Sequence, residues 1–210
     1  MACFSYTPCA RTEVHNANLL GASFLCRLAQ LTGQQRFLEP ALEAARYSVR
    51  KQHPDGSWDY GESPHQHWID NFHTGYNLVA LKRIREFGKT GEFDAAITRG
   101  LDFYTAHFFR PDGAPRYFHD ATYPVDVHSV AQSIITLHEL GTFGEDHGDL
   151  SRSVLRWSLD NLWDTRGFFY YQRWPHRTVR TSFMRWSQAW MLLALSTFLE
   201  QDQLYRGKDD

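Results

Sequence analysis

The chain has 210 residues, 42% of them hydrophobic and 22% charged, a composition that fits one substantial globular domain. Its formal net charge of −2 gives no electrostatic basis for binding nucleic acid. No apolar run reaches the roughly 18 residues that a membrane-spanning helix needs, so none is expected.

Apolar residues recur with helical periodicity in seven segments of the chain. Short connections that contain glycine alternate with long connections, and Gly just past a helix end commonly stops the helix. The predicted helices cover residues 15–31, 36–52, 72–88, 92–109, 128–143, 149–163 and 184–200. The long connections are 53–71, 110–127 and 164–183, and long structured loops in a compact domain are often functional.

These segments form a repeat of helix, tight turn, helix and long loop. Polar residues open the first, third, fifth and seventh helices at separations of 58, 55 and 57, namely His15, His73, His128 and Arg185. Each long loop carries a Gly that a Tyr follows four residues later: Gly56 and Tyr60, Gly113 and Tyr117, Gly167 and Tyr171.

The odd-numbered helices carry few charges, whereas residues 36–52 carry charges along their whole length. A helix that is apolar on most sides is buried, and a helix with a charged face meets solvent. We therefore expect an all-α chain, an incomplete α/α toroid whose inner layer is made of the odd-numbered helices. It would form a single domain over residues 1–210, with an entering loop at 1–14, a disordered tail at 201–210 and one small β-hairpin within 167–180.

The chain holds about three and a half helical hairpins, whereas a closed toroid usually needs about six, and neither end shows the polar face of a terminal repeat. Two explanations stay open. The chain is the C-terminal part of a longer protein, or it covers its core by self-association.

Residues 45–58, ARYSVRKQHPDGSW, resemble the QW motif of the terpenoid cyclase and prenyltransferase toroids. The resemblance implies an α/α toroid. The acidic DxDD motif of the protonating cyclases and the zinc-binding set of the protein prenyltransferases are absent from the sequence.

A second resemblance covers most of the chain. The segments FSYTP, RTEVHNANLLGA, DGSWDYGE, WIDNFHTGYNL and MRWSQAWMLLAL resemble α/α-toroid proteins associated with bacterial polysaccharide and O-antigen biosynthesis, some of them labelled delta-aminolevulinic acid dehydratase. The dehydratases of that name are TIM barrels with a Schiff-base lysine, and here no lysine follows a strand. The resemblance therefore implies carbohydrate chemistry, since the related six-hairpin fold contains glycosidases, polysaccharide lyases and sugar epimerases.

Proton transfer on a sugar needs carboxylates or imidazoles that face a cleft. Polar side chains at the starts of apolar helices indicate such a cavity, although each could simply satisfy a local loop carbonyl. Asp126 has the character of an N-cap, and Asp70 is either an N-cap or a group that its aromatic neighbours desolvate. The predicted catalytic residues are His73, Asp70, His15 and His128.

The predicted substrate-binding residues are aromatic, amide or cationic side chains in the long loops and at the inner-helix starts. Tyr and Trp stack on sugar rings and Arg binds a carboxylate, and plain packing of the 167–180 hairpin is the alternative reading. The set comprises Asn16, Asn18, Trp58, Tyr60, Tyr117, Tyr171, Arg173, Arg185 and Trp186.

The run His65-x-His67-x-x-Asp70-x-x-His73 matches no standard metal site, so neither a metal nor a cofactor is expected. Three cysteines without a CxxC pair argue against a disulfide framework and favour a cytoplasmic location.

We conclude that the sequence predicts a carbohydrate-active protein of surface-polysaccharide metabolism. It would act on or bind an acidic or amino sugar by general acid/base chemistry, as an epimerase, lyase or hydrolase if it is an enzyme. The alternatives are a terpenoid-type toroid that handles a lipid-linked intermediate, and a non-catalytic binding or scaffold protein.

Overall fold

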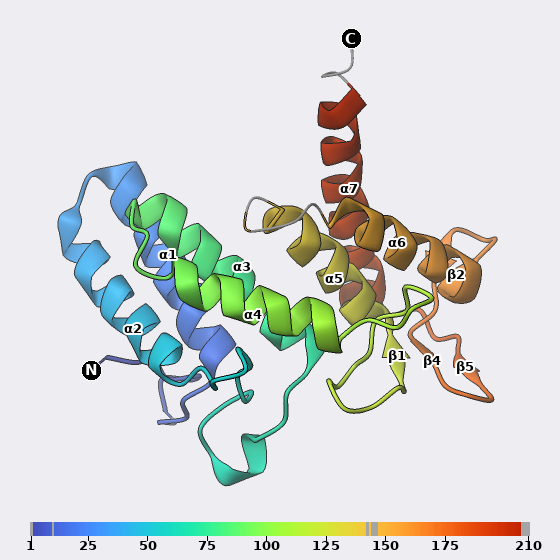
Figure 1. Cartoon of the computed structure of the whole chain (residues 1–210), viewed down its shortest axis with the longest axis horizontal. Coiled ribbons are helices and arrows are strands. Elements are labelled where there is room, and N and C mark those ends of the chain that lie inside the picture. The colour runs from blue at the N-terminus through green and yellow to red at the C-terminus, as the bar shows by residue number, and fades with distance from the viewer. Residues whose placement is uncertain (1, 10, 142, 144–146, 207–210) are drawn as a thin grey trace. The chain divides into compact units, whose positions relative to one another are not determined.

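The computed structural model describes residues 2–9, 11–141, 143 and 147–206, with side chains up to Glu200. By its contacts the chain divides into two compact units, Met1–Ala106 and His107–Asp210. All seven predicted helices are present (Figure 1). None of the described helices combines the length and the apolar character that crossing a bilayer requires.

The first unit contains α1 (His15–Thr32), α2 (Leu38–Arg50), α3 (Asn71–Gly88) and α4 (Asp94–His107), with short 3-10 turns η1 (Gln35–Phe37) and η2 (Pro64–Gln66). α1 packs along α3, and α2 covers α1 from outside (Figure 1). α2 buries only small or apolar residues such as Ala41 and Ala45, so its charged face is left to solvent. The predicted inner and outer layers are confirmed here.

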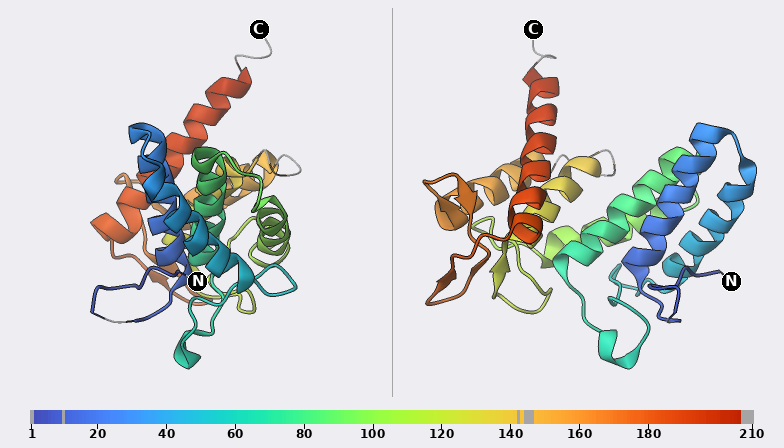
Figure 2. Two further views of the ribbon diagram at one scale, coloured as in Figure 1. Left: turned by 90° about the vertical axis from the view of Figure 1, so that its left-hand side faces the viewer. Right: turned by 180° about the vertical axis from the view of Figure 1, so that it is seen from behind.

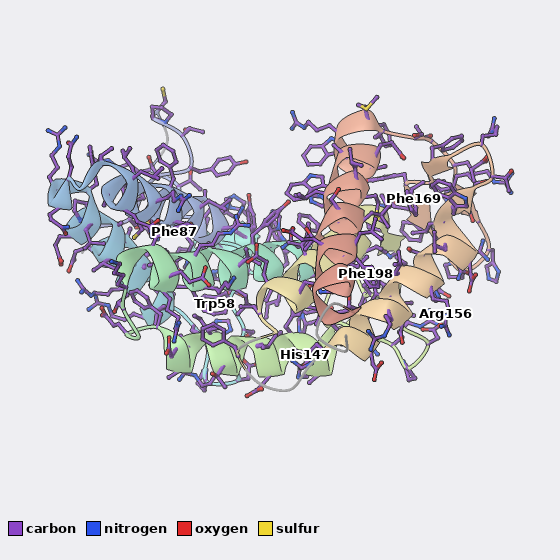
Figure 3. All side chains as sticks on the ribbon, turned by 90° about the horizontal axis from the view of Figure 1, so that it is seen from above. Trp58, Phe87, His147, Arg156, Phe169 and Phe198 are labelled. Atoms are coloured by element: carbon purple, nitrogen blue, oxygen red, sulfur yellow. The ribbon has the colours of Figure 1, made fainter. Side chains whose placement is uncertain are left out.

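The second unit contains α5 (Val127–Glu139), α6 (Gly148–Leu162), the π-helix η3 (Met184–Ala189) and α7 (Trp190–Arg206). α5 packs against both α6 and α7, and Val127–Leu137 are all buried. Phe198 projects from α7 (Figure 3), and its ring lies 5.3 Å from the ring of His138 of α5. The odd-numbered helices are therefore the inner ones in this unit as well.

Short strands occupy the long loops of the second unit: β1 (Val125–Asp126), β2 (Trp163–Asp164), β3 (Phe168–Phe169), β4 (Gln172–Arg173) and β5 (Thr178–Val179). β2 pairs with β3, while β4 pairs with β1 on one side and β5 on the other, all antiparallel. The predicted β-hairpin is confirmed as β4–β5, and the other pairs were not foreseen because two-residue strands leave no periodic signal.

The recurring Asp-Gly turns dock on the following outer helix. Gly56 has φ +96°, and a Cβ there would lie 2.1 Å from the carbonyl oxygen of Arg99 in α4. Gly113 has φ +87°, and a Cβ there would lie 2.7 Å from the backbone of Ser153 in α6. Gly167 has φ +95° with nothing within 4 Å of such an atom. Glycine is thus required for its conformation at all three sites and for close approach at two.

Trp58 anchors the first long loop beneath α4 (Figure 3). It is 1% exposed, its Nε1 donates to the carbonyl of Ser48 at 2.9 Å, and its ring fits where Gly100 has no side chain. Gln52 donates to the carbonyls of Gly56 and Ala96, both at 2.9 Å. These contacts join the end of α2 to the next hairpin, as the resemblance to the QW motif implies.

Helix ends differ from the predicted ones by a few residues. α4 ends at His107, two residues early, because the Phe108 carbonyl accepts from Arg116 N of the following loop. α5 ends at Glu139, and the predicted Gly141–Gly144 connection lies partly outside the described residues. The backbone of α7 is described to Arg206, and residues 207–210 of the expected tail lie outside the described residues.

Candidate functional site

The clearest acid–base pair of the first unit stands at the start of α3. Asp70 is 2% exposed and caps the helix, because its Oδ1 accepts from His73 N at 3.0 Å. Its Oδ2 accepts from His73 Nδ1 at 2.7 Å and from Trp68 Nε1 at 2.9 Å. The N-cap interpretation of Asp70 is therefore confirmed, and the same carboxylate also bonds an imidazole.

The ring of His73 is bounded by aromatic rings on several sides. Its centroid lies 4.5 Å from that of Tyr60, 4.3 Å from Phe72 and 6.1 Å from Tyr76, and Tyr60 stacks on Trp68 at 4.6 Å. The His73 side chain keeps 21% of its surface exposed. A carboxylate on Nδ1 fixes the tautomer, so Nε2 is the nitrogen left to act on a ligand. We call Tyr60, Trp68, Asp70 and His73 the dyad cluster.

His15 is held differently, inside a closed hydrogen-bond network. It is 1% exposed, with Nε2 2.9 Å from Glu62 and Nδ1 3.1 Å from Ser48. Burial lowers the pKa of His15. An ionised Glu62 only accepts, so Nε2 donates to it and the neutral ring accepts at Nδ1 from the Ser48 hydroxyl.

Glu62 also accepts from Lys51. Burial favours its neutral form, but the hydrogen bonds from Lys51 and His15 and the charge of Lys51 hold the pKa of Glu62 below its ordinary value. Serine, imidazole and carboxylate follow one another here as in a nucleophile–base–acid triad. Ser48 is completely buried, however, so the network ties α1, α2 and the loop together instead of presenting a nucleophile.

The two asparagines predicted to bind substrate differ in whether their side chains are already hydrogen-bonded within the fold. Asn18 is completely buried, with its Nδ2 donating to the carbonyl of Ala44 at 2.7 Å and to Ser48 Oγ at 2.9 Å, and its Oδ1 accepting from Phe4 N at 2.8 Å. The amide nitrogen and oxygen of Asn18 are thus both bonded to the protein itself, which gives this side chain a structural role. Asn16 is half-buried, and its buried Oδ1 has no protein partner.

In the second unit, Asp126 and His128 stand at the start of α5. Asp126 is 2% exposed, and it accepts from His128 N at 2.8 Å and from Gln172 Nε2 at 2.8 Å. Burial raises the pKa of Asp126 to about 6, against the opposing effect of these hydrogen bonds. The predicted N-cap is present, and the carboxyl also titrates closer to neutrality than an ordinary aspartate.

His128 lies against tryptophans of the last inner helix. Its ring is stacked 4.7 Å from Trp190 and lies 5.9 Å from Trp186, and the Arg185 guanidinium covers Trp186 at 4.5 Å. Trp186 remains 46% exposed. Arg185 and Trp186 lie in η3, where Ser187 N and Gln188 N both donate to Phe183 O, at 2.9 and 3.1 Å. π-helical turns are frequent at functional sites.

The remaining predicted binding residues lie on the loops of the second unit. Tyr171 is half-buried beside Asp126, and its pKa is raised by burial and by that carboxylate. Arg173 donates to Thr178 Oγ1 at 2.6 Å across the hairpin, and Tyr117 packs on Phe118 at 4.6 Å. Trp58 is enclosed in the core of the first unit, as described above.

In the first unit the structure brings Tyr60, Asp70 and His73 together, and in the second unit it brings His128, Arg185 and Trp186 together. The separate contacts described above hold His15, Asn18, Trp58, Tyr117 and Arg173. Glu62, Ser48 and Trp68 were missed because they lie in an aperiodic loop or on an outer helix, where no spacing signals them. Among the described residues, no three His, Cys, Asp or Glu side chains are grouped so that they could hold a metal ion.

Comparisons with known proteins show the fold class. No family model and no curated protein matches the sequence. Several solved structures match, including an unsaturated glucuronyl hydrolase specific for heparin, at 14% identity and a TM-score of 0.71 over 91% of this chain and 60% of that one. A protein from Listeria innocua matches at 11% identity and 0.75, over 96% and 60%. A polysaccharide lyase matches at 14% and 0.69, over 94% and 64%.

These similarities establish an incomplete α/α toroid, the fold class predicted from the repeat. The chain spans about 60% of the length of the first structures it matches. At such low identity the comparison concerns architecture, and any activity has to be argued from the residues themselves.

Proposed function

We propose that this chain is a carbohydrate-active α/α-toroid protein that acts on an acidic sugar by general acid/base chemistry. The observation that carries the proposal is the dyad cluster, a buried carboxylate bonded to Nδ1 of a partly exposed imidazole among aromatic rings. The fold similarity to a glucuronyl hydrolase and to a polysaccharide lyase supports carbohydrate as the ligand class.

In this proposal each residue of the dyad cluster has a distinct role. His73 accepts or delivers a proton through Nε2, and Asp70 holds the ring in the required tautomer. Tyr60 and Trp68 offer aromatic surface on which a sugar ring stacks. His15, which the sequence predicts as a catalytic residue, is proposed here as a positioning residue, because both of its ring nitrogens are engaged within the fold.

The second unit has a proton-transfer group and a binding surface of its own. Asp126, with a pKa of about 6, can give up or take a proton near neutral pH. Arg185 and Trp186 present a cation and an exposed ring, a combination suited to a uronate carboxylate and its sugar face.

The decisive experiment substitutes His73 by Ala and by Gln, with His107 to Ala as a control. We expect the His73 variants to lose turnover of unsaturated glucuronyl oligosaccharides and to keep a thermal midpoint within a few degrees of the parent. His107 closes α4 on a more exposed surface. Full activity in both His73 variants, or collapse of the fold with no separable effect on turnover, would remove the dyad from the mechanism.

Isothermal titration separates this proposal from a lipid-handling toroid. Uronate oligosaccharides should release heat on binding, while polyprenyl phosphates should not. The reverse pattern would favour the terpenoid-type alternative, and no binding of either would favour a scaffold. We also propose that the protein belongs to bacterial surface-polysaccharide metabolism and forms a single domain. We propose a cytoplasmic location as well, which cell fractionation tests.

Self-association is also proposed, through two exposed faces of inner helices. On α1 these residues are Leu20, Phe24 and Leu31, and on α7 they are Leu192, Leu193 and Leu199, all between 43% and 68% exposed. Inner helices pair with inner helices in both units, so a second copy offers a matching surface. Sedimentation should show an associated species that Phe24→Glu or Leu192→Glu dissociates, and a parent protein that is monomeric at all concentrations would contradict it.

A further inference from the structure

The segment from β2 to the end of η3 is strongly cationic in a chain that is otherwise acidic. Residues 163–189 contain five arginines and one aspartate, a formal charge of +4. Since the whole chain carries −2, the other residues together carry −6. The positive charge is therefore concentrated on one loop region of the second unit.

The arginines of the β4–β5 hairpin are not neutralised by carboxylates. Arg173 bonds a threonine hydroxyl, Arg177 lies 5.5 Å from the ring of Trp174, and Arg180 lies 5.5 Å from the ring of Tyr170. Within the described part of the chain, no ion pair with a carboxylate joins any of the three. We call Arg173, Arg177 and Arg180 the arginine ribbon.

Arg166, in the same region, is paired with a carboxylate and so provides a contrast to the arginine ribbon. Arg166 binds Asp164 in bidentate fashion at 2.9 and 3.0 Å, and this contact holds the pKa of Asp164 well below its ordinary range. The ribbon has no such partner, so its charge remains available to an external anion.

The hairpin holds the ribbon along a fixed edge. Arg173 pairs with Thr178 across the two strands, and Trp174 N donates to Arg177 O at 2.8 Å at the turn. The other edge of β4 is anchored by β1 (Figure 2). Arg177 and Arg180 flank β5, the edge strand of this sheet, and their three-residue separation covers about 10 Å at the usual rise per strand residue. Because side chains alternate along a strand, the two guanidinium groups leave this edge toward opposite faces.

We propose that the arginine ribbon binds an acidic oligosaccharide of several units, with a carboxylate or sulfate on successive sugars meeting successive guanidinium groups. It rests on the proposed function only for carbohydrate as the ligand class, and it is independent of proton transfer at the dyad cluster. Trp174 and Tyr170 add aromatic rings between the cations, which suits alternating sugar faces and acidic groups. The positive net charge is confined to this segment, since the remaining residues together carry −6, and this favours a short acidic oligosaccharide over a long polyanion.

The test is titration with mono-, di- and tetragalacturonate at low and moderate salt. We expect affinity to rise with chain length, to fall with salt, and to be absent for a neutral tetrasaccharide. Arg177→Gln and Arg180→Gln should each weaken tetragalacturonate binding about three- to tenfold, and the double variant more. Circular dichroism verifies that the variants fold.

Arg156→Gln is the matched control, because it removes the same charge from the exposed surface of α6 in the same unit (Figure 3). If Arg156→Gln weakened tetragalacturonate binding equally, or if mono- and tetragalacturonate bound with equal affinity, the proposed role of the arginine ribbon would be wrong. Equal binding of oligothymidylate or of phosphatidylserine vesicles, with the same response to the variants, would overturn carbohydrate as its ligand. Oligosaccharide binding that persists in His73→Ala while turnover is lost would separate the ribbon from the proposed chemistry.

Discussion

Replacing Asp126 by Asn should raise the free energy of unfolding relative to that of the parent protein, and this difference should grow as the pH rises. The carboxyl is 2% exposed, and its burial raises the pKa from an ordinary 3.8 to about 6. Asn keeps an oxygen for His128 N, and the amide of Gln172 can turn to accept from the new amide group. The substitution thus removes the titration while largely retaining the helix cap.

The sign follows from proton binding. Between pH 3.8 and about 6 the folded chain holds a proton at Asp126 that the unfolded chain has released. The stability associated with this group is complete below 3.8 and is lost as the pH passes about 6. One pKa unit corresponds to about 1.4 kcal/mol, so burying the charged form at neutral pH costs about 3 kcal/mol.

The assay is urea denaturation at about pH 4 and pH 7, followed by tryptophan fluorescence. The free energy of unfolding of Asp126→Asn minus that of the parent should increase by about 2 to 3 kcal/mol between these conditions. Asp160→Asn, at an exposed site on α6, controls for the chemical change. A difference that does not vary with pH would refute the assigned burial, and an equal variation at Asp160 would attribute the effect to the unfolded chain.

Two further predictions concern the packing that carries the site. Gly56→Ala should lower the free energy of unfolding by about 3 kcal/mol or more, because it combines an unfavourable positive φ with overlap on the carbonyl of Arg99, whereas Gly167→Ala should lose only about 1 kcal/mol. Equal losses in thermal or urea denaturation would contradict the docking of the first turn. Ser48→Ala should lower the free energy of unfolding by about 1–3 kcal/mol, since it leaves Nδ1 of buried His15 without its donor. Unchanged stability would show that the network rearranges.

The sequence was sufficient to predict the helices and their layering, because periodicity and charge distribution report burial directly. The few charges of residues 128–143 correctly placed that helix inside, and the charges spread along 36–52 correctly placed that one outside. The spacing of His15, His73 and His128 revealed the repeat.

The roles of those residues were harder to predict from the sequence, because they depend on contacts with residues in the loops and on other helices. Nothing in the spacing distinguishes His15, which Glu62 and Ser48 enclose, from His73, which keeps an exposed edge. From the sequence, Trp58 could equally bind a sugar ring or pack in the core. The structure shows that its ring packs in the core, where Gly100 has no side chain. Contacts between segments distant in sequence decide these cases, and local pattern does not record them.

The π-helical turn before α7 has a consequence for how this chain can vary. A bond from Gln188 N to Phe183 O spans five residues instead of four, which is equivalent to one residue inserted into an ordinary helix. Met191 and Ala194 downstream still face the core, while Gln188 clasps the backbone of Phe169 through two bonds, at 3.0 and 2.8 Å. A single added codon is therefore enough to reorient the side chains of η3 while the helix that follows it keeps its alignment.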